Sequence, residues 1–236
     1  INAISQEEAA EFMKKNKIVS ELKYFELDSS SIITYTINEL LETNDIINIG
    51  LSGGSTPLPV LNLVKNHKID FKKINFFLVD ERNVSNNSEE SNYHNLNHSF
   101  FKYIDSDVFF YDDKISKELS VINYENTIWS KLPISKQLPK FDLIILGMGI
   151  DGHTASIFPN SAAESEFGKL VFLNYVDKLN SFRKTFTYPL ILNANKILVL
   201  VKGVDKINLI NNLSMAHPIK KIIDEANNIN ILCSKI

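Results

Sequence analysis

The chain has 236 residues, of which 44% are hydrophobic and 22% charged, and it fits one α/β domain better than two small ones. A formal net charge of −3 without basic runs offers no field for nucleic acid, and no apolar run approaches the roughly 20 residues that span a bilayer. The single cysteine, Cys233, excludes an intrachain disulfide framework and favours a reducing compartment, so we expect a cytoplasmic protein.

The first residues, INAISQEEAAEF, lack the basic start and the apolar stretch of a signal peptide. Because the chain begins with Ile1 rather than Met, we expect residues 1–236 to be a single domain excised from a longer polypeptide.

Short runs rich in Ile, Val, Leu and Phe predict strands at residues 46–51, 74–79, 142–147, 170–176, 196–201 and 228–233. Their hydrophobicity is continuous rather than alternating, which is typical of strands covered on both faces. Candidate helices lie between them, near residues 31–42, 57–66, 91–102, 114–131 and 204–213. This alternation predicts a doubly wound α/β domain with a mostly parallel sheet and a ligand crevice at the carboxyl ends of the strands.

The first strand runs into a loop rich in glycine and serine that spans residues 52–56, and Pro57 follows as the first residue of a predicted helix. Adjacent glycines allow a tight turn with exposed N–H groups, and Thr56 could cap the helix. Such a loop can bind a phosphate, although it lacks the ending of a Walker A motif. An ordinary strand-to-helix turn explains this loop equally well.

The second strand ends in Asp80, Glu81 and Arg82. The guanidinium could hold a phosphate, and a carboxylate could handle or orient a proton. A structural ion pair is the alternative for an isolated triplet. The polar stretch that follows leads into a predicted helix at about Ser91.

The strand at 142–147 is followed by three glycines in the spacing G-x-G-x-x-G, namely Gly147, Gly149 and Gly152. Pro159 comes too soon for the long helix of a dinucleotide site, and no acid ends a second strand about 20 residues later. Asp151 and His153 on this loop are instead a candidate acid and base pair, with a structural histidine as the alternative. Of the five histidines, only His153 lies beside a carboxylate at a predicted strand end.

Together these segments resemble the 6-phosphogluconolactonase family, within the broader glucosamine-6-phosphate isomerase/deaminase-like superfamily. The matching stretches are LSGGSTP (51–57), VDER (79–82) with EESNY (89–93), and LGMGIDGHTASIFP (146–159). Two weaker matches run from Arg183 to Thr187 and over VKGVDK (201–206). Ile150 departs from the family, which usually has proline there.

The resemblance implies a Rossmann-like three-layer α/β/α fold without metal or cofactor. It implies hydrolysis of 6-phosphogluconolactone to 6-phosphogluconate, a step of the pentose phosphate pathway. His153 would be the general base that deprotonates water, with Asp151 and Asp80 as site carboxylates, either of which could orient it. The implied phosphate and substrate ligands are Ser52, Gly53, Gly54, Ser55, Thr56, Arg82, Arg183 and Lys206.

A base must be neutral, and we expect the pKa of His153 to lie near the ordinary histidine value of about 6.5. One base, an anchored phosphate and a cation near the developing oxyanion suffice to open a lactone. The expected partner is a small phosphosugar lactone. Some lineages fuse this domain to glucose-6-phosphate dehydrogenase, so fusion or association with that enzyme is a further expectation.

Three other functions are open to this chain. A glucosamine-6-phosphate deaminase would favour Asp-Glu-Tyr where this chain has Asp80-Glu81-Arg82. It would also carry an acid just beyond the histidine, and none is present here. A non-catalytic sugar-phosphate sensor would need no His153 and would usually carry a DNA-binding segment. A nicotinamide-dependent dehydrogenase rests only on the glycine spacing.

Overall fold

A parallel sheet of seven strands forms the centre of the molecule, in the order β1-β12-β11-β8-β2-β3-β5. This computed structural model describes residues 3–13 and 19–235. The strands of the sheet are β1 (Val19–Leu22), β2 (Ile47–Leu51), β3 (Ile74–Leu78), β5 (Asp107–Phe109), β8 (Leu143–Gly147), β11 (Ile197–Val201) and β12 (Ile229–Ser234).

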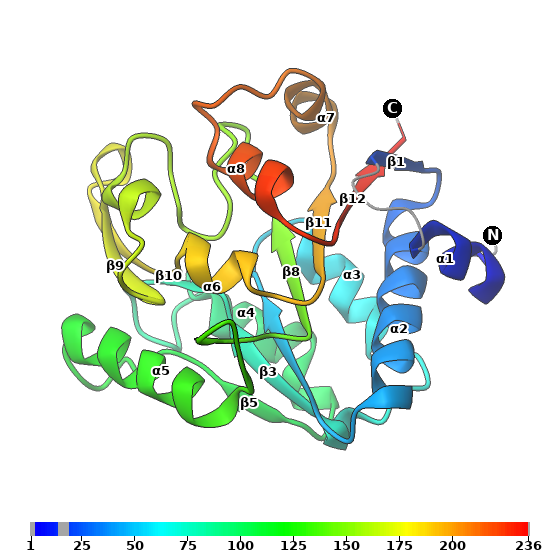
Figure 1. Cartoon of the computed structure of the whole chain (residues 1–236), viewed down its shortest axis with the longest axis horizontal. Coiled ribbons are helices and arrows are strands. Elements are labelled where there is room, and N and C mark those ends of the chain that lie inside the picture. Colours follow the sequence, from blue (N-terminus) through cyan, green and yellow to red (C-terminus); the bar gives the residue numbers. More distant parts are fainter. Residues whose placement is uncertain (1–2, 14–18, 236) are drawn as a thin grey trace.

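Helices cover both faces of this sheet (Figure 1). On one side lie α1 (Gln6–Met13), α2 (Phe25–Thr43) and α3 (Pro57–Val64). On the other side lie α5 (Lys117–Lys131), α6 (Tyr188–Leu192) and α8 (Pro218–Glu225). The remaining α-helices are α4 (Asn92–Ser99) and α7 (Val204–Asn211), and the short 3-10 helices are η1 (Phe71–Lys73), η2 (Phe101–Tyr103), η3 (Ala162–Ser165) and η4 (Asp177–Leu179). This is the Rossmann-like three-layer arrangement that the resemblance implied.

The apolar strands make the core of the domain. Every residue of β2 and β11 is buried, as their continuous hydrophobic runs predict. Ile32, Ile33 and Ile37 of α2 join the same buried cluster. Each such side chain stabilises the fold by about 1.5–3 kcal/mol relative to an exposed one.

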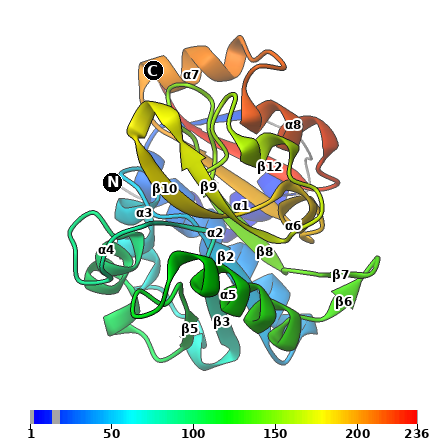
Figure 2. The same ribbon diagram turned by 90° about the vertical axis from the view of Figure 1, so that its left-hand side faces the viewer.

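The strand predicted at 170–176 exists as β9 (Val171–Val176), but it does not belong to the parallel sheet. It pairs with β10 (Ser181–Phe186), which pairs with β4 (Asp80–Arg82), in an antiparallel sheet of order β4-β10-β9. Figure 2 shows β9 and β10 as a curved pair beside the main sheet. The prediction that this strand lies in the parallel sheet was wrong, because β9 is not covered on both faces. Asn174 is buried, whereas Tyr175 is exposed.

The other predicted strands lie in the parallel sheet, and the predicted helices correspond to α2, α3, α4, α5 and α7. A small hairpin of β6 (Ile134–Ser135) and β7 (Leu138–Pro139) was not predicted. That residues 1–236 form one domain stays a prediction, since both ends lie outside the described residues. Within residues 3–13 and 19–235, no helix combines the length and the apolar character needed to cross a membrane.

Candidate active site

A cavity of about 260 Å³ lies at the carboxyl ends of β2 and β8, beside β4 and α7. It brings together most of the predicted site residues, namely Ser52, Gly53, Gly54, Ser55, Thr56, Asp80, Arg82, His153 and Lys206. The other two, Asp151 and Arg183, do not line it. Asp151 contacts His153, and Arg183 pairs with Arg82 across the small sheet.

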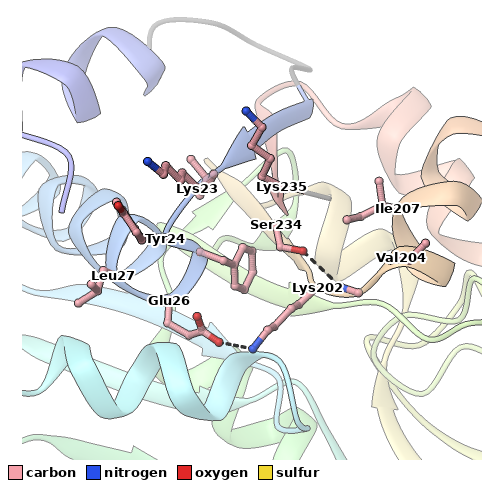
Figure 3. Close-up of a pocket in the computed structure, with 12 residues that line it drawn as sticks. Lys23, Tyr24, Glu26, Leu27, Lys202, Val204, Ile207, Ser234 and Lys235 are labelled. Carbon is pink, nitrogen blue, oxygen red and sulfur yellow. Dashed lines mark hydrogen bonds and ion pairs between the residues drawn. The ribbon is translucent and has the colours of Figure 1, made fainter. Parts of the chain in front are cut away.

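A larger cavity, of about 530 Å³, lies at the ends of β1, β11 and β12 (Figure 3). Its polar residues include Lys23, Lys235 and the ion pair of Lys202 with Glu26. Among the described residues that line it, none is a histidine or comes from the three predicted strand-end motifs. The smaller cavity alone combines a base, a carboxylate and cations, so we take it as the candidate active site.

The two glycines of the loop from Ser52 to Thr56 allow its tight turn and its close packing against Asn92. Gly54 has a φ of +102°, a conformation that favours glycine, and a Cβ on Gly53 would lie 2.4 Å from the side-chain oxygen of Asn92. Ser52 Oγ is buried and has no hydrogen-bond partner among the described residues, which is costly unless a ligand supplies one. The expected cap is wrong, because Thr56 is helical and its side chain makes no capping bond, although Pro57 does begin α3.

The carboxylates of Asp80 and Glu81 have different roles: Asp80 lies at the cavity, and Glu81 binds the start of α4. Asp80 is buried at the cavity, where its Oδ2 accepts a hydrogen bond of 2.7 Å from Ser156 Oγ. Glu81 forms no ion pair among the described residues. Its carboxylate accepts hydrogen bonds from Ser91 Oγ and from the backbone N–H groups of residues 92 and 93, at the start of α4. It also accepts one from the backbone N–H of residue 82. Burial raises the pKa of Glu81, and these hydrogen bonds oppose the rise. Glu81 therefore fixes α4 beside the cavity. The helix begins next to Ser91, as predicted, and the side chain of Ser91 caps it.

Three cations meet near the cavity. Arg82 of β4 and Arg183 of β10 are direct partners in the antiparallel ladder, where like charges repel. Burial, and then the charge of Arg82, lowers the pKa of Arg183, and burial lowers the pKa of Lys206 on α7. Across the part of the chain that the structure describes, no ion pair involves any of the three. The group is thus suited to a multiply charged anion.

His153 is oriented by Asp151 and not by Asp80. The Nδ1 atom of His153 lies 2.5 Å from Asp151 Oδ1, and the backbone N–H of His153 donates to the same oxygen at 3.2 Å. A carboxylate there places the proton of the neutral ring on Nδ1 and leaves Nε2 as the basic nitrogen. Gly149 makes room for this arrangement, since a Cβ at that position would lie 2.1 Å from Nδ1.

The pKa of His153 is lower than the sequence led us to expect. Burial lowers it to about 4, the charge of Asp80 opposes this shift, and the charges of Lys206, Arg183 and Arg82 add to it. The expected value near 6.5 is that of an unperturbed histidine and took no account of burial or of the effect of these cations on the ring. His153 is therefore neutral, and able to accept a proton, well into the acid range.

Sequence reasoning missed three residues that complete the site. Asn92 lines the cavity and donates to the backbone oxygen of Asp80 at 2.9 Å, and Ser156 binds the Asp80 carboxylate. Both lie inside the segments quoted above, which could have indicated them. The third residue is Lys178 on η4, whose Nζ forms an ion pair with Asp151 Oδ2. No motif in the neighbouring sequence indicates that it belongs to the site.

Comparisons with known proteins match most of this chain. A family model described as glucosamine-6-phosphate isomerases/6-phosphogluconolactonase matches residues 27–229. A 6-phosphogluconolactonase of Thermotoga maritima is 35% identical over 175 residues, which cover 73% of this chain and 76% of that protein. One from Treponema pallidum is 34% identical over 184 residues, covering 75% and 76%. A crystal structure of the T. maritima 6-phosphogluconolactonase superposes with a TM-score of 0.82 at 29% identity, covering 93% of this chain and 99% of that one.

Proposed function

Since this chain belongs to the glucosamine-6-phosphate isomerase/6-phosphogluconolactonase family, we propose that it hydrolyses 6-phosphogluconolactone to 6-phosphogluconate. This is a step of the pentose phosphate pathway, as the name of the relatives implies. The observation that carries the proposal is a neutral histidine, oriented through Nδ1, in one cavity with cations that lack a carboxylate partner among the described residues.

In this mechanism the phosphate of the substrate is bound by Arg82, Arg183 and Lys206, together with the N–H groups of the loop from Ser52 to Thr56. Anchoring the phosphate fixes the position of the lactone carbonyl, which replaces a bimolecular encounter by a nearly unimolecular step.

His153 Nε2 takes a proton from water while the water oxygen attacks the carbonyl carbon. Asp151 holds the ring and stabilises the imidazolium that forms. The negative charge that develops on the carbonyl oxygen is stabilised by the nearby cations. Collapse of the intermediate breaks the bond to the ring oxygen, which takes the proton back from His153 and becomes a hydroxyl group.

We propose that no metal takes part, because the cavity offers one histidine nitrogen and a single aspartate, fewer ligands than a catalytic zinc takes. Nor does any group of three or more His, Cys, Asp or Glu within residues 3–13 and 19–235 suit a metal ion. Cytoplasmic location, action as a single domain and association with glucose-6-phosphate dehydrogenase remain predictions.

The direct test offers the protein fresh 6-phosphogluconolactone and glucosamine 6-phosphate in parallel and measures consumption above spontaneous hydrolysis. We expect only the lactone to be consumed. His153→Gln, which keeps polarity and approximate size, should lower the acceleration by roughly 10² to 10⁴, while calorimetry shows that 6-phosphogluconate still binds.

Near-parental turnover by a folded His153→Gln protein would refute the mechanism. Consumption of glucosamine 6-phosphate would favour the deaminase, and a parent protein that binds phosphosugars without turnover would favour the sensor.

A further inference from the structure

Among the residues that the structure describes, Lys178 is the one lysine or arginine that forms an ion pair with Asp151, the partner of the candidate base. It lies on η4, the turn between β9 and β10, and its Nζ forms an ion pair with Asp151 Oδ2. The other carboxylate oxygen of Asp151 accepts both hydrogen bonds from His153. The carboxylate is therefore held from two sides, by the histidine on the loop after β8 and by the lysine on the small sheet.

The ring of Phe158 ties the same two groups together. His153 stacks on it with a centroid distance of 4.2 Å and an interplanar angle of 25°. The Nζ of Lys178 lies 4.7 Å from the centroid of Phe158. Lys178 is half-exposed, whereas Asp151 is largely covered, so the lysine closes the solvent side of the pair.

A carboxylate on Nδ1 has two effects that oppose each other in a general base. It orients the ring, but its charge also favours the imidazolium, which cannot accept a proton. Charged groups from each neighbouring element decide the balance. The charge of Asp80 on β4 favours the imidazolium, and the charges of Lys206 on α7, Arg183 on β10 and Arg82 on β4 disfavour it. Asp151 contacts both His153 and Lys178, and Asp177 adjoins Lys178 on η4. His217, before α8, packs on Gly152 of the histidine loop.

We propose that Lys178 is a positioning residue that acts on His153 through Asp151: it offsets the charge of that carboxylate so that His153 stays neutral. This assignment rests on the proposed hydrolysis. Asp151 thereby keeps its geometric effect on the ring while its effect on ring charge is reduced. Because Oδ1 still accepts both donors of His153, loss of Lys178 should leave the hydrogen bond in place and leave the charge of Asp151 unopposed.

The test compares Lys178→Met with Lys178→Arg, which keeps the charge. Lys169→Met is the matched control, since Lys169 is an exposed lysine two residues before β9 that does not line the active-site cavity. The readout is the pH titration of the His153 ring resonance by NMR, assigned with His153→Gln. In Lys178→Met the pKa of His153 should rise by roughly 0.5 to 1 unit, while both other variants keep the parental value.

Catalysis supplies the second readout. If hydrolysis depends on neutral His153, kcat/KM of Lys178→Met should fall roughly 1.2- to 1.8-fold further than that of the parent between pH 7.5 and 5. Lys178→Arg should restore the parental profile. An unchanged or lower pKa of His153 in folded Lys178→Met would overturn the assignment. The titration needs no turnover, so an inactive parent would refute the proposed function and leave the assignment of Lys178 to be decided by NMR.

Discussion

The low pKa of His153 predicts a pH-dependent penalty on folding that can be measured without any substrate. In the unfolded chain the ring titrates near pH 6.5, and in the folded protein near pH 4. Between these values the unfolded chain binds a proton that the folded protein does not, so stability falls as the pH falls through this window. Above about pH 6.5 neither state is protonated and the penalty vanishes.

The size of the penalty follows from the two pKa values. A gap of about 2.5 units at about 1.4 kcal/mol per unit gives at most about 3 kcal/mol at pH 4 and below, and about 2 kcal/mol at pH 5. The side chain of His153 is 30% exposed, so these figures are upper values. Glutamine at this position carries no titrating group and should escape the penalty.

The assay is urea unfolding of the parent and of His153→Gln, followed by circular dichroism at pH 7.5, 6 and 5. The free energy of unfolding of the variant, minus that of the parent, should increase by about 2 kcal/mol from pH 7.5 to 5. Taking the difference cancels the carboxylates that both proteins share. A difference that stays flat with pH, or that decreases, would show that His153 is not desolvated as described.

Further outcomes follow from individual contacts. Arg183→Ala should raise KM roughly tenfold or more with little change in kcat, because a charged partner of the phosphate is lost; steady-state kinetics check this. Gly53→Ala should weaken 6-phosphogluconate binding in calorimetry, since its Cβ would collide with Asn92, whereas Gly168→Ala, where a Cβ has room, should bind like the parent. Glu81→Gln should lower the free energy of unfolding by roughly 1 to 3 kcal/mol in urea, because the amide turns a donor toward backbone N–H groups. Strong chelators should leave turnover unchanged, and loss of activity that a divalent ion restores would contradict the metal-free mechanism.

The parallel sheet and the strand-end loops could be predicted because their signals are local. A strand such as β11 is a continuous apolar run, and the loops that contain Gly53 and His153 follow such runs directly. The small antiparallel sheet gives no such signal. β4 has only three residues, and β10 buries Lys184 and Thr185 among its residues, so neither strand looks apolar.

What the sequence could not supply were contacts between distant segments. The partner of His153 could be narrowed to two carboxylates, but only folding shows that Asp151 and not Asp80 binds Nδ1. Lys178 reaches Asp151 from a turn that reads as an ordinary polar loop. The pKa of His153 was misjudged for the same reason, since burial and three cations from other elements act on it together.

The pairing of β1 with β12 has a consequence for the order in which the molecule assembles. Val19 lies opposite Ile231, so nearly the whole chain must be ordered before this edge of the sheet can close. Loop-closure entropy makes such a contact unfavourable until the intervening segments are in place, which predicts that β1 docks last. It should also be the first strand to detach, and its amides should exchange with solvent faster than those of β8 or β11. Because the active-site cavity is built from β2, β4 and β8, that edge can open and close while the catalytic groups stay assembled.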